Sequence, residues 1–172
     1  DVYKRQSDFG REHHQMEELL NICDSWNVPV LIDMAYFGMC YNIEIDLSHK
    51  CIEEVTFSLG KTFPIIGARA GIRLQKQEVD DAVLFANQHG IVNNFGAMIG
   101  LTCIENWDSD YIVRKYIETQ LEVCSMLEVE PSKCIIFATS ENDLWQPLNR
   151  GNKSSRLCIS EDIILHHDKE SN

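Results

Sequence analysis

The segment that most constrains this chain is Val55 to Leu74, VTFSLGKTFPIIGARAGIRL, which spaces a serine, a lysine and an arginine along a mostly apolar stretch. Lys61 has apolar neighbours in the sequence, and removing an amine from water lowers its pKa towards the range where it becomes a nucleophile. Ser58 and Arg69 are residue types that bind phosphate, through a hydroxyl donor and a guanidinium fork. The three together predict a site for an aldehyde cofactor that carries a phosphate.

Two other interpretations of Lys61 are open at this point. A lysine at the end of a strand commonly lays its stem along apolar surface and keeps its amine in water. Gly60, Lys61 and Thr62 also match the end of a nucleotide-binding phosphate loop. That motif requires a glycine at the position where this chain has Val55, so the phosphate-loop interpretation is disfavoured.

The segment resembles the lysine region of the class I and II aminotransferases, in which S-x-x-K is followed by G-x-R-x-G. The matching residues are Ser58, Lys61, Gly67, Arg69 and Gly71. The resemblance implies that the cofactor is pyridoxal phosphate. It also implies that Lys61 holds this cofactor as a Schiff base and serves as the catalytic residue, while Ser58 and Arg69 anchor its phosphate.

Two further motifs carry the same resemblance. IDMAYF resembles the family's D-x-A-Y motif, with Asp33 lying 28 residues before Lys61, and SSRLCIS resembles a strand near the family's C-terminus. The resemblance implies that Asp33 pairs with the pyridine nitrogen of the cofactor, that Tyr36 donates to its ring hydroxyl, and that Arg156 binds the substrate carboxylate. Taken singly, these residues could equally be a turn cap, a core tyrosine and a surface arginine on an edge strand.

The function that the resemblance implies is transfer of an amino group between an amino acid and a 2-oxo acid by a cytoplasmic homodimer. One alternative is a decarboxylase or lyase on the same scaffold, because the cofactor supports these reactions too. Another is the aminotransferase-like ligand-sensing domain of a transcription regulator. A third is an α/β interaction domain whose motifs are coincidental. The sequence does not define which amino acid or oxo acid would be used.

The apolar pattern predicts an α/β chain in which helices alternate with short buried strands. The expected helices cover residues 11–27, 78–87, 92–104 and 108–130, and the expected strands cover 28–35, 51–58, 68–75, 133–140 and 155–160. The resemblance implies that residues 7–106 are the C-terminal part of a fold type I large domain, with a partial, mostly parallel sheet covered by helices. Residues 107–172 would form a small α+β domain, and the strand over 68–75 would run antiparallel.

The beginning of the chain is expected to be a truncation. Residues 1–6, DVYKRQ, read like the translation of a transposon-end sequence used in preparing sequencing libraries. They are therefore set apart from the fold as an artefact. Residues 7–10, SDFG, stand where the family commonly has N-P-T-G, so Ser7 replaces an asparagine that usually contacts the cofactor.

Charge and cysteine usage exclude several other classes. A formal net charge of −12 argues against a nucleic-acid surface, which needs clustered Lys and Arg. No apolar run is long enough to cross a membrane. The seven cysteines show no C-x-x-C pair and are interpreted as buried, reduced thiols in a reducing compartment. The doublets His13–His14 and His166–His167 are expected at the surface, and no metal site is predicted.

Overall fold

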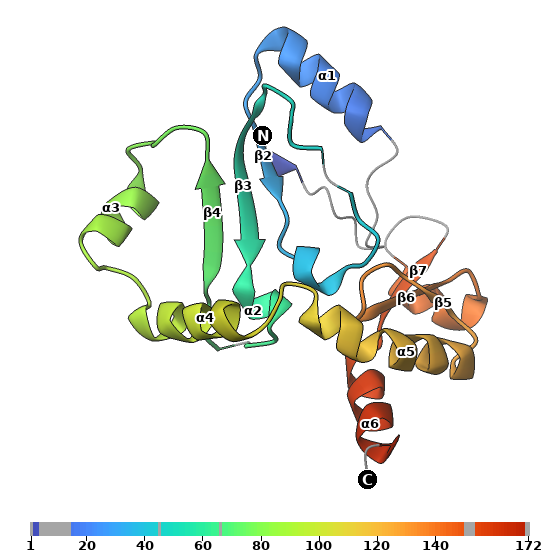
Figure 1. Cartoon of the computed structure of the whole chain (residues 1–172). Helices are drawn as coiled ribbons and strands as arrows, with labels where there is room; N and C mark the ends of the chain where they lie inside the picture. The colour runs from blue at the N-terminus through green and yellow to red at the C-terminus, as the bar shows by residue number, and fades with distance from the viewer. Residues whose placement is uncertain (1, 4–14, 45, 66, 150–153, 171–172) are drawn as a thin grey trace.

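The computed structural model describes residues 2–3, 15–44, 46–65, 67–149 and 154–170 (Figure 1). These residues form two units, each with its own β-sheet. The first unit contains a sheet of four strands and the second a sheet of three. The connection between them runs through the residues between helices α4 and α5.

The first sheet has the strand order β1-β2-β3-β4 and consists of β1 (Val2–Tyr3), β2 (Val30–Asp33), β3 (Ile52–Ser58) and β4 (Gly71–Gln75). The pairs β1–β2 and β2–β3 are parallel, whereas β3–β4 is antiparallel. The prediction of a mostly parallel sheet with an antiparallel returning strand is therefore confirmed. Because β2 and β3 run in the same direction, their carboxyl ends meet at one edge of the sheet.

Strand β1 lies inside the six residues that were set apart as an artefact. Val2 pairs with Leu31, and Tyr3 pairs with Ile32. Strand pairing is made by main-chain atoms and does not depend on which side chains are present. The pairing therefore does not test the origin of these residues.

Helix α1 (Met16–Trp26) covers one face of this sheet. Met16 and Leu20 are almost fully buried and pack in one core cluster with Ile32 and other residues of β2 and β3. Trp26, the last residue of the same helix, is 77% exposed. At 3.6 residues per turn, its position is rotated by about 80° from that of Met16, so the side chain leaves the buried face.

Three helices follow the sheet strands: α2 (Leu59–Thr62), α3 (Ala82–Gln88) and α4 (Asn94–Asn106). Helix α2 is a single turn that was not predicted, and it continues directly from β3. In Figure 1, α2 and α4 lie beside each other at the end of the sheet where β3 terminates. Leu59 of α2, Phe63 and Cys103 of α4 form a core cluster there, so α4 supports the segment that carries the lysine.

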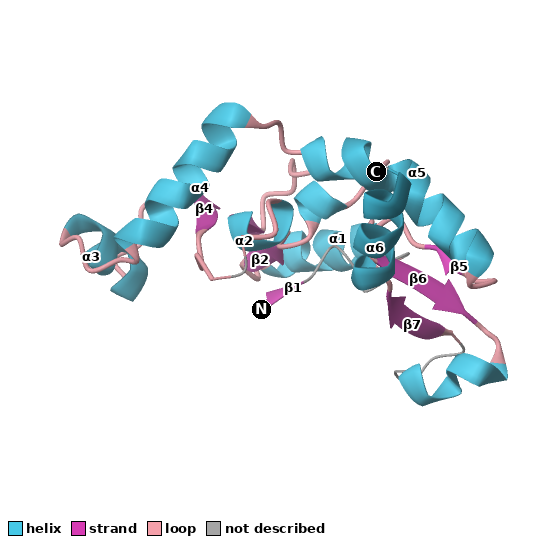
Figure 2. Ribbon diagram, turned by 90° about the horizontal axis from the view of Figure 1, so that it is seen from below, coloured by secondary structure: helices cyan, strands magenta, loops and turns pink. Residues whose placement is uncertain are grey.

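The second unit combines two helices with the small antiparallel sheet, and Figure 2 shows α6 lying against α5. Its elements are α5 (Tyr111–Met126), β5 (Glu130–Pro131), β6 (Phe137–Ser140), the 3₁₀ segment η2 (Asp143–Leu148), β7 (Ser155–Cys158) and α6 (Ser160–Glu170). Helix α5 ends earlier than expected because Glu128 adopts a left-handed conformation (φ 53°) that a continuing helix does not allow. Residues 133–136 form a loop instead of the first half of a strand, and α6 was not predicted.

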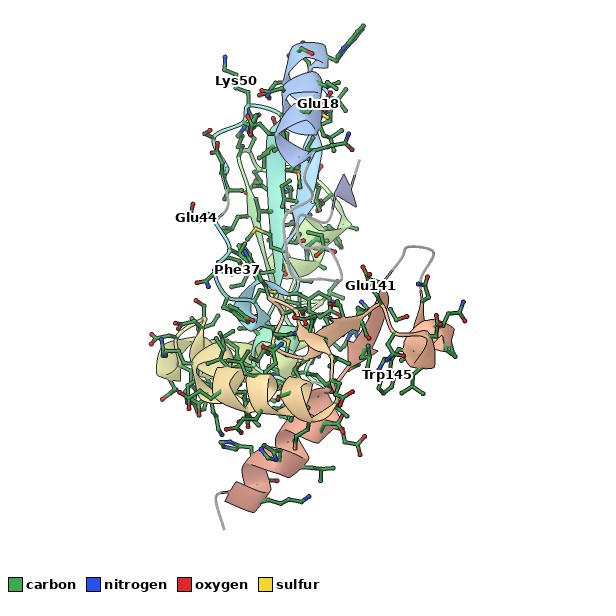
Figure 3. The ribbon with its side chains drawn as sticks, turned by 90° about the vertical axis from the view of Figure 1, so that its right-hand side faces the viewer. Glu18, Phe37, Glu44, Lys50, Glu141 and Trp145 are labelled. Carbon is green, nitrogen blue, oxygen red and sulfur yellow. The ribbon has the colours of Figure 1, made fainter. Side chains whose placement is uncertain are left out.

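One core cluster joins the two units. It contains Met39, at the end of the 3₁₀ turn η1 (Phe37–Met39), together with Cys134, Ile135 and Phe137 of the second unit. Figure 3 labels Phe37 in this turn. A Cβ atom on Gly38 would lie 2.3 Å from Thr62 and 2.8 Å from the carbonyl oxygen of Ser109, so only glycine permits this close packing. The turn thus holds the end of the first sheet against the start of α5.

Apolar side chains remain exposed along β4, α3 and α4, where nothing in the described part of the chain covers them. They are Ile72, Leu74, Val83, Phe85, Phe95, Met98, Leu101 and Ile104. An exposed apolar surface of this kind marks an interaction face or the place where further polypeptide packs. Among the described helices, none has the length and apolar character needed to span a bilayer.

All seven cysteines are free thiols. Four of them are buried, Cys23 and Cys40 are partly buried, and Cys158 is exposed. The expectation of buried thiols is therefore confirmed for most positions and wrong for Cys158, which is the last residue of β7 and points away from the core.

Candidate active site

The carboxyl edge of the first sheet carries a cavity of about 530 Å³. It is lined by Ala35, Phe57, Ser58, Gly60, Lys61, Arg69, Ala70 and Gly71. Ser58 ends β3, Lys61 lies in α2, and Arg69 precedes β4, which returns beside β3 with Gly71 opposite Ser58. The structure therefore brings together the serine, lysine and arginine that the sequence singled out.

Lys61 is half-buried, and its amine lies over an aromatic ring. The Nζ atom is 4.0 Å from the centroid of the Tyr36 ring, a distance typical of a cation–π contact. Two of its apolar neighbours in the sequence, Leu59 and Phe63, pack with Cys103 in a core cluster. The role inferred for Lys61 from these neighbours stays a prediction.

Arg69 occupies an unusual backbone conformation. Its φ of 49° places it in the left-handed region, which costs free energy for any residue other than glycine. The nearby Gly71 allows β4 to approach β3, since a Cβ there would lie 2.7 Å from the carbonyl oxygen of Phe57. Gly67 of the same motif has no such role, because a Cβ there would have no atom within 4 Å.

Asn93 holds the segment before Arg69, a role that sequence reasoning missed. Its Nδ2 donates to the carbonyl oxygen of Ala68 at 2.6 Å, while its Oδ1 accepts from the backbone N–H of Gly96 at 2.9 Å and so caps helix α4. A Cβ on Gly96 would lie 1.8 Å from the same Ala68 oxygen. An asparagine just before a helical pattern indicates a cap, but no pattern in the sequence predicts its second partner.

Asp33 ends β2, on the strand next to the one that ends at Ser58. Its Oδ1 accepts a hydrogen bond from the backbone N–H of Ala35 at 3.0 Å, so the residue does cap the turn that follows the strand. Ala35 lines the cavity, whereas Asp33 is not among the lining residues. The geometry thus fits the capping interpretation and leaves the pairing with a cofactor nitrogen as a proposal.

Arg156 stands on β7 of the second unit, opposite Thr139 of β6. Its Cζ atom lies 4.4 Å from the centroid of the Phe137 ring. That ring meets the Tyr36 ring edge-on, with the centroids 5.7 Å apart and an angle of 60° between the planes. The two rings, here called the aromatic pair, therefore contact each other, and each carries one of the two cations. Phe137 was not singled out in the sequence because it is one of several apolar residues in KCIIFATS.

A further group of ligand-type side chains lies away from this cavity. Glu17, Asp46 and His49 each offer one atom within 4.8 Å of the others. His49 already uses both ring nitrogens, with Asp24 at 3.0 Å and Glu17 at 3.3 Å, so the group is accounted for as a link between α1 and the loop before β3.

The histidine doublets lie only partly within the described residues. His166 contacts Glu122 at 3.0 Å on the surface of the second unit. His13, His14 and Ser7 lie outside the described residues, so the expectations for them stay untested.

Comparison of solved structures finds this fold in aminotransferases. A probable N-succinyldiaminopimelate aminotransferase from Thermus thermophilus superposes with a TM-score of 0.64 at 15% identity, covering 98% of this chain and 56% of its own. An aromatic aminotransferase from Pyrococcus horikoshii superposes with a TM-score of 0.63 at 11% identity, and the match covers 98% of this chain and 58% of that protein. A PLP-bound putative aminotransferase from Clostridium difficile superposes with a TM-score of 0.62 at 15% identity, and the match covers 99% of this chain and 58% of that protein. At these identities the likeness establishes the fold, and the present chain spans little more than half the length of each.

A comparison with curated protein sequences gives no significant match. The sequence model of the family "Aminotransferase class I and II", in contrast, matches residues 12–121, which is more than half of the chain. This match includes Asp33, Tyr36, Ser58, Lys61 and Arg69, and stops before Arg156. By this match and by its fold, the chain belongs to the class I and II aminotransferase family.

Proposed function

We propose that this chain is part of a pyridoxal-phosphate-dependent enzyme that transfers an amino group between an amino acid and a 2-oxo acid. The observation that carries the proposal is the shared cavity of Ser58, Lys61 and Arg69 at the carboxyl edge of the sheet. In open α/β sheets, ligands bind outside the carboxyl ends of the strands. Family membership supplies the reaction class.

The donor set of the cavity fits the cofactor. Pyridoxal phosphate supplies an aldehyde for covalent attachment and a ring that withdraws electrons from the substrate α-carbon. Lys61 offers the amine for that attachment. Ser58 and Arg69 offer a hydroxyl and a guanidinium for the phosphate. The hydrogen bond from Asn93 to the carbonyl oxygen of Ala68 restrains the backbone next to Arg69. A phosphate held at a fixed point converts binding free energy into orientation of the reacting group.

The other residues take roles around this centre. Tyr36 lies against Lys61 and would donate its hydroxyl to the cofactor ring, while Asp33 would keep the ring nitrogen protonated from the adjacent strand end. Arg156 would bind the substrate carboxylate in a bidentate pair. Because Arg156 belongs to the second unit, substrate would be held between the two units. Lys61, once released, would move the proton at the α-carbon.

We further propose a homodimer in the cytoplasm. The exposed apolar side chains of α3 and α4 support an interface with a second copy or with further polypeptide, and the free cysteines fit a reducing compartment. Sedimentation of the full-length polypeptide would test the dimer. A monomer at micromolar concentration would contradict it.

The experiment that tests the proposal is borohydride reduction of the full-length polypeptide after incubation with pyridoxal phosphate. Reduction makes the attachment permanent, and digestion followed by mass spectrometry identifies the modified lysine. We expect the cofactor at Lys61 and its loss in Lys61→Ala. Lys50→Ala and Lys76→Ala are matched controls, because Lys76 donates to the carbonyl oxygen of Lys50 at 2.7 Å, away from the cavity lining. Modification at either control lysine in place of Lys61 would refute the assignment.

A second measurement tests the reaction type. The cofactor-loaded protein is mixed with single amino acids, and release of the matching 2-oxo acid is followed by chromatography. Amino transfer predicts that one oxo acid appears per cofactor in the absence of an acceptor. Release of carbon dioxide or of a β-leaving group instead would favour a decarboxylase or a lyase.

A further inference from the structure

Cys40 and Cys134 face each other across the boundary between the two units. Cys40 follows the turn η1 of the first unit, and Cys134 lies in the loop before β6 of the second. The two residues form an isolated antiparallel β-bridge. Both belong to the core cluster that contains the aromatic pair. This is the one described place where a cysteine of the first unit pairs with a cysteine of the second.

The backbone hydrogen bonds define how the two side chains meet. Tyr41 donates its N–H to the carbonyl oxygen of Lys133 at 3.0 Å, and Ile135 donates to the carbonyl oxygen of Met39 at 2.7 Å. These bonds flank the cysteines and make them a non-hydrogen-bonded antiparallel pair. In such a pair the Cα atoms are about 4.5 Å apart and the side chains lie on the same face. A disulfide requires Cα atoms about 4.4–6.8 Å apart, so this backbone already meets the requirement.

The backbone of Cys134 is held in place on both sides. Its N–H donates to Oγ of Ser132 at 3.0 Å, and its carbonyl oxygen accepts from Nε2 of the buried Gln120 at 3.1 Å. The pairing therefore does not depend on a chance loop position.

The two thiols contact each other. The thiol of Cys40 hydrogen-bonds to Cys134, which lowers the pKa of Cys134 and raises that of Cys40. Burial opposes the lowering at Cys134, and the positive charges of Arg156 and Lys61 add to it. Cys40 is partly exposed and gives a small oxidant access to the pair.

We propose that Cys40 and Cys134 are a redox modification site that forms a reversible disulfide between the two units. With hydrogen peroxide as oxidant, the thiolate of one of the two cysteines attacks one peroxide oxygen and becomes a sulfenic acid, while the leaving hydroxide takes up a proton as water. The thiol of the other cysteine then loses its proton and attacks the sulfenic sulfur, which expels a second hydroxide that is protonated to water. Two thiols are oxidised, one peroxide is reduced to two waters, and a dithiol reductant reverses the change by exchange.

The cross-link would fix the aromatic pair. Tyr36 precedes Cys40 by four residues, and Phe137 follows Cys134 by three, so a covalent bond between the cysteines restrains both rings and the two cations that rest on them. If amino transfer needs Arg156 to move relative to Lys61, oxidation lowers turnover and reduction restores it. This consequence rests on the proposed function, whereas the cross-link itself does not.

The test is direct mapping of the bond. The full-length polypeptide is incubated with hydrogen peroxide, remaining thiols are blocked with N-ethylmaleimide, and the digest is analysed by mass spectrometry. We expect a peptide containing Cys40 joined to one containing Cys134, two fewer titratable thiols, and complete reversal by dithiothreitol. Cys40→Ser abolishes the cross-link, and Cys40→Ala does the same if serine disturbs the fold. Cys158→Ser, which changes the exposed thiol at the end of β7, leaves the cross-link unchanged.

Two results would overturn the proposal. One is recovery of both Cys40 and Cys134 as maleimide adducts after oxidation. The other is a bond of either residue to a third cysteine, such as Cys124. Because the readout is a covalent bond, it is independent of cofactor binding and of amino transfer.

Discussion

Replacing Gly96 by alanine would show whether helix α4 determines the position of Arg69. A glycine in a helix is about 0.5–1 kcal/mol less favourable than alanine, so propensity alone predicts that Gly96→Ala stabilises the protein. The new Cβ, however, would lie 1.8 Å from the main-chain oxygen of Ala68. Backbone cannot rotate out of the way, and overpacking of this kind costs about 1–3 kcal/mol. The clash outweighs the propensity, and we expect a net loss of about 1–2 kcal/mol.

Gly100 in the same helix provides a matched control. A Cβ there would meet a terminal methyl of Leu59 at 2.9 Å and the Cβ of Ala70 at 3.2 Å. The leucine methyl is the end of a flexible side chain and can shift, so the gain in propensity offsets most of the cost. We expect Gly100→Ala to change the free energy of unfolding by less than about 0.5 kcal/mol.

The two variants should also differ in cofactor binding. Gly96→Ala pushes on the Ala68 carbonyl, displaces its hydrogen bond to Asn93 and moves the adjacent Arg69, so pyridoxal phosphate should bind more weakly. Gly100→Ala should leave binding unchanged. The assays are urea unfolding, compared at constant m-value, and a spectroscopic titration with the cofactor, both on the full-length polypeptide. Equal stability of the two variants, or tighter cofactor binding by Gly96→Ala, would refute the reasoning.

Three further predictions concern separate parts of the molecule. Arg156→Ala should slow single turnovers with an amino acid by about 30- to 4,000-fold, because losing one charge pair costs about 2–5 kcal/mol. Cofactor retention should be unchanged. An equal loss of rate with an amine that lacks the carboxylate would show that Arg156 is structural. The hydrogen bond to Asp24 raises the pKa of His49 above its ordinary 6.5, so its stabilising contribution is complete below pH 6.5 and is lost as the pH rises through the folded-state pKa. The melting temperature should therefore fall above pH 6.5 more steeply in the wild type than in His49→Gln. The same dependence of melting temperature on pH in both proteins would disprove the contribution of His49. Gln120→Leu should destabilise the protein by about 1–3 kcal/mol, the net worth of two hydrogen bonds, because the two N–H groups of Nε2 are shared among the carbonyl oxygens of Ser132, Cys134 and Phe137, each of which keeps another donor; unchanged urea unfolding would contradict this.

The sequence predicted the elements whose signals are local. Alternating helices and short buried strands were recognisable from apolar periodicity, and the antiparallel direction of the strand over 68–75 followed from the resemblance carried by Ser58, Lys61 and Arg69. These three residues converge in one cavity because β4 runs antiparallel to β3 and begins beside the residue where β3 ends. Helix α6 was not predicted because its sequence, SEDIILHHDKE, mixes polar and apolar residues without a clear apolar stripe.

Contacts between distant segments could not be predicted in this way. The partner of Asn93 is a main-chain oxygen 25 residues away, and main-chain atoms carry no sequence signature. The pairing of Cys40 with Cys134 likewise depends on how the two units dock.

The aromatic pair places a ring face against each of the two cations of the proposed site. Lys61 rests on the face of Tyr36 and Arg156 on the face of Phe137, so each positive charge meets the negative face of a ring. A cation–π contact is worth about 0.5–2 kcal/mol, depending on exposure. Removing one partner of a buried carboxylate–guanidinium pair costs about 2–5 kcal/mol, much of it because the other charge is left unpaired. Under the proposed function, the Phe137 ring holds the guanidinium in position for a substrate carboxylate, and because a ring face accepts no bidentate hydrogen bond, it does not take the place of that carboxylate.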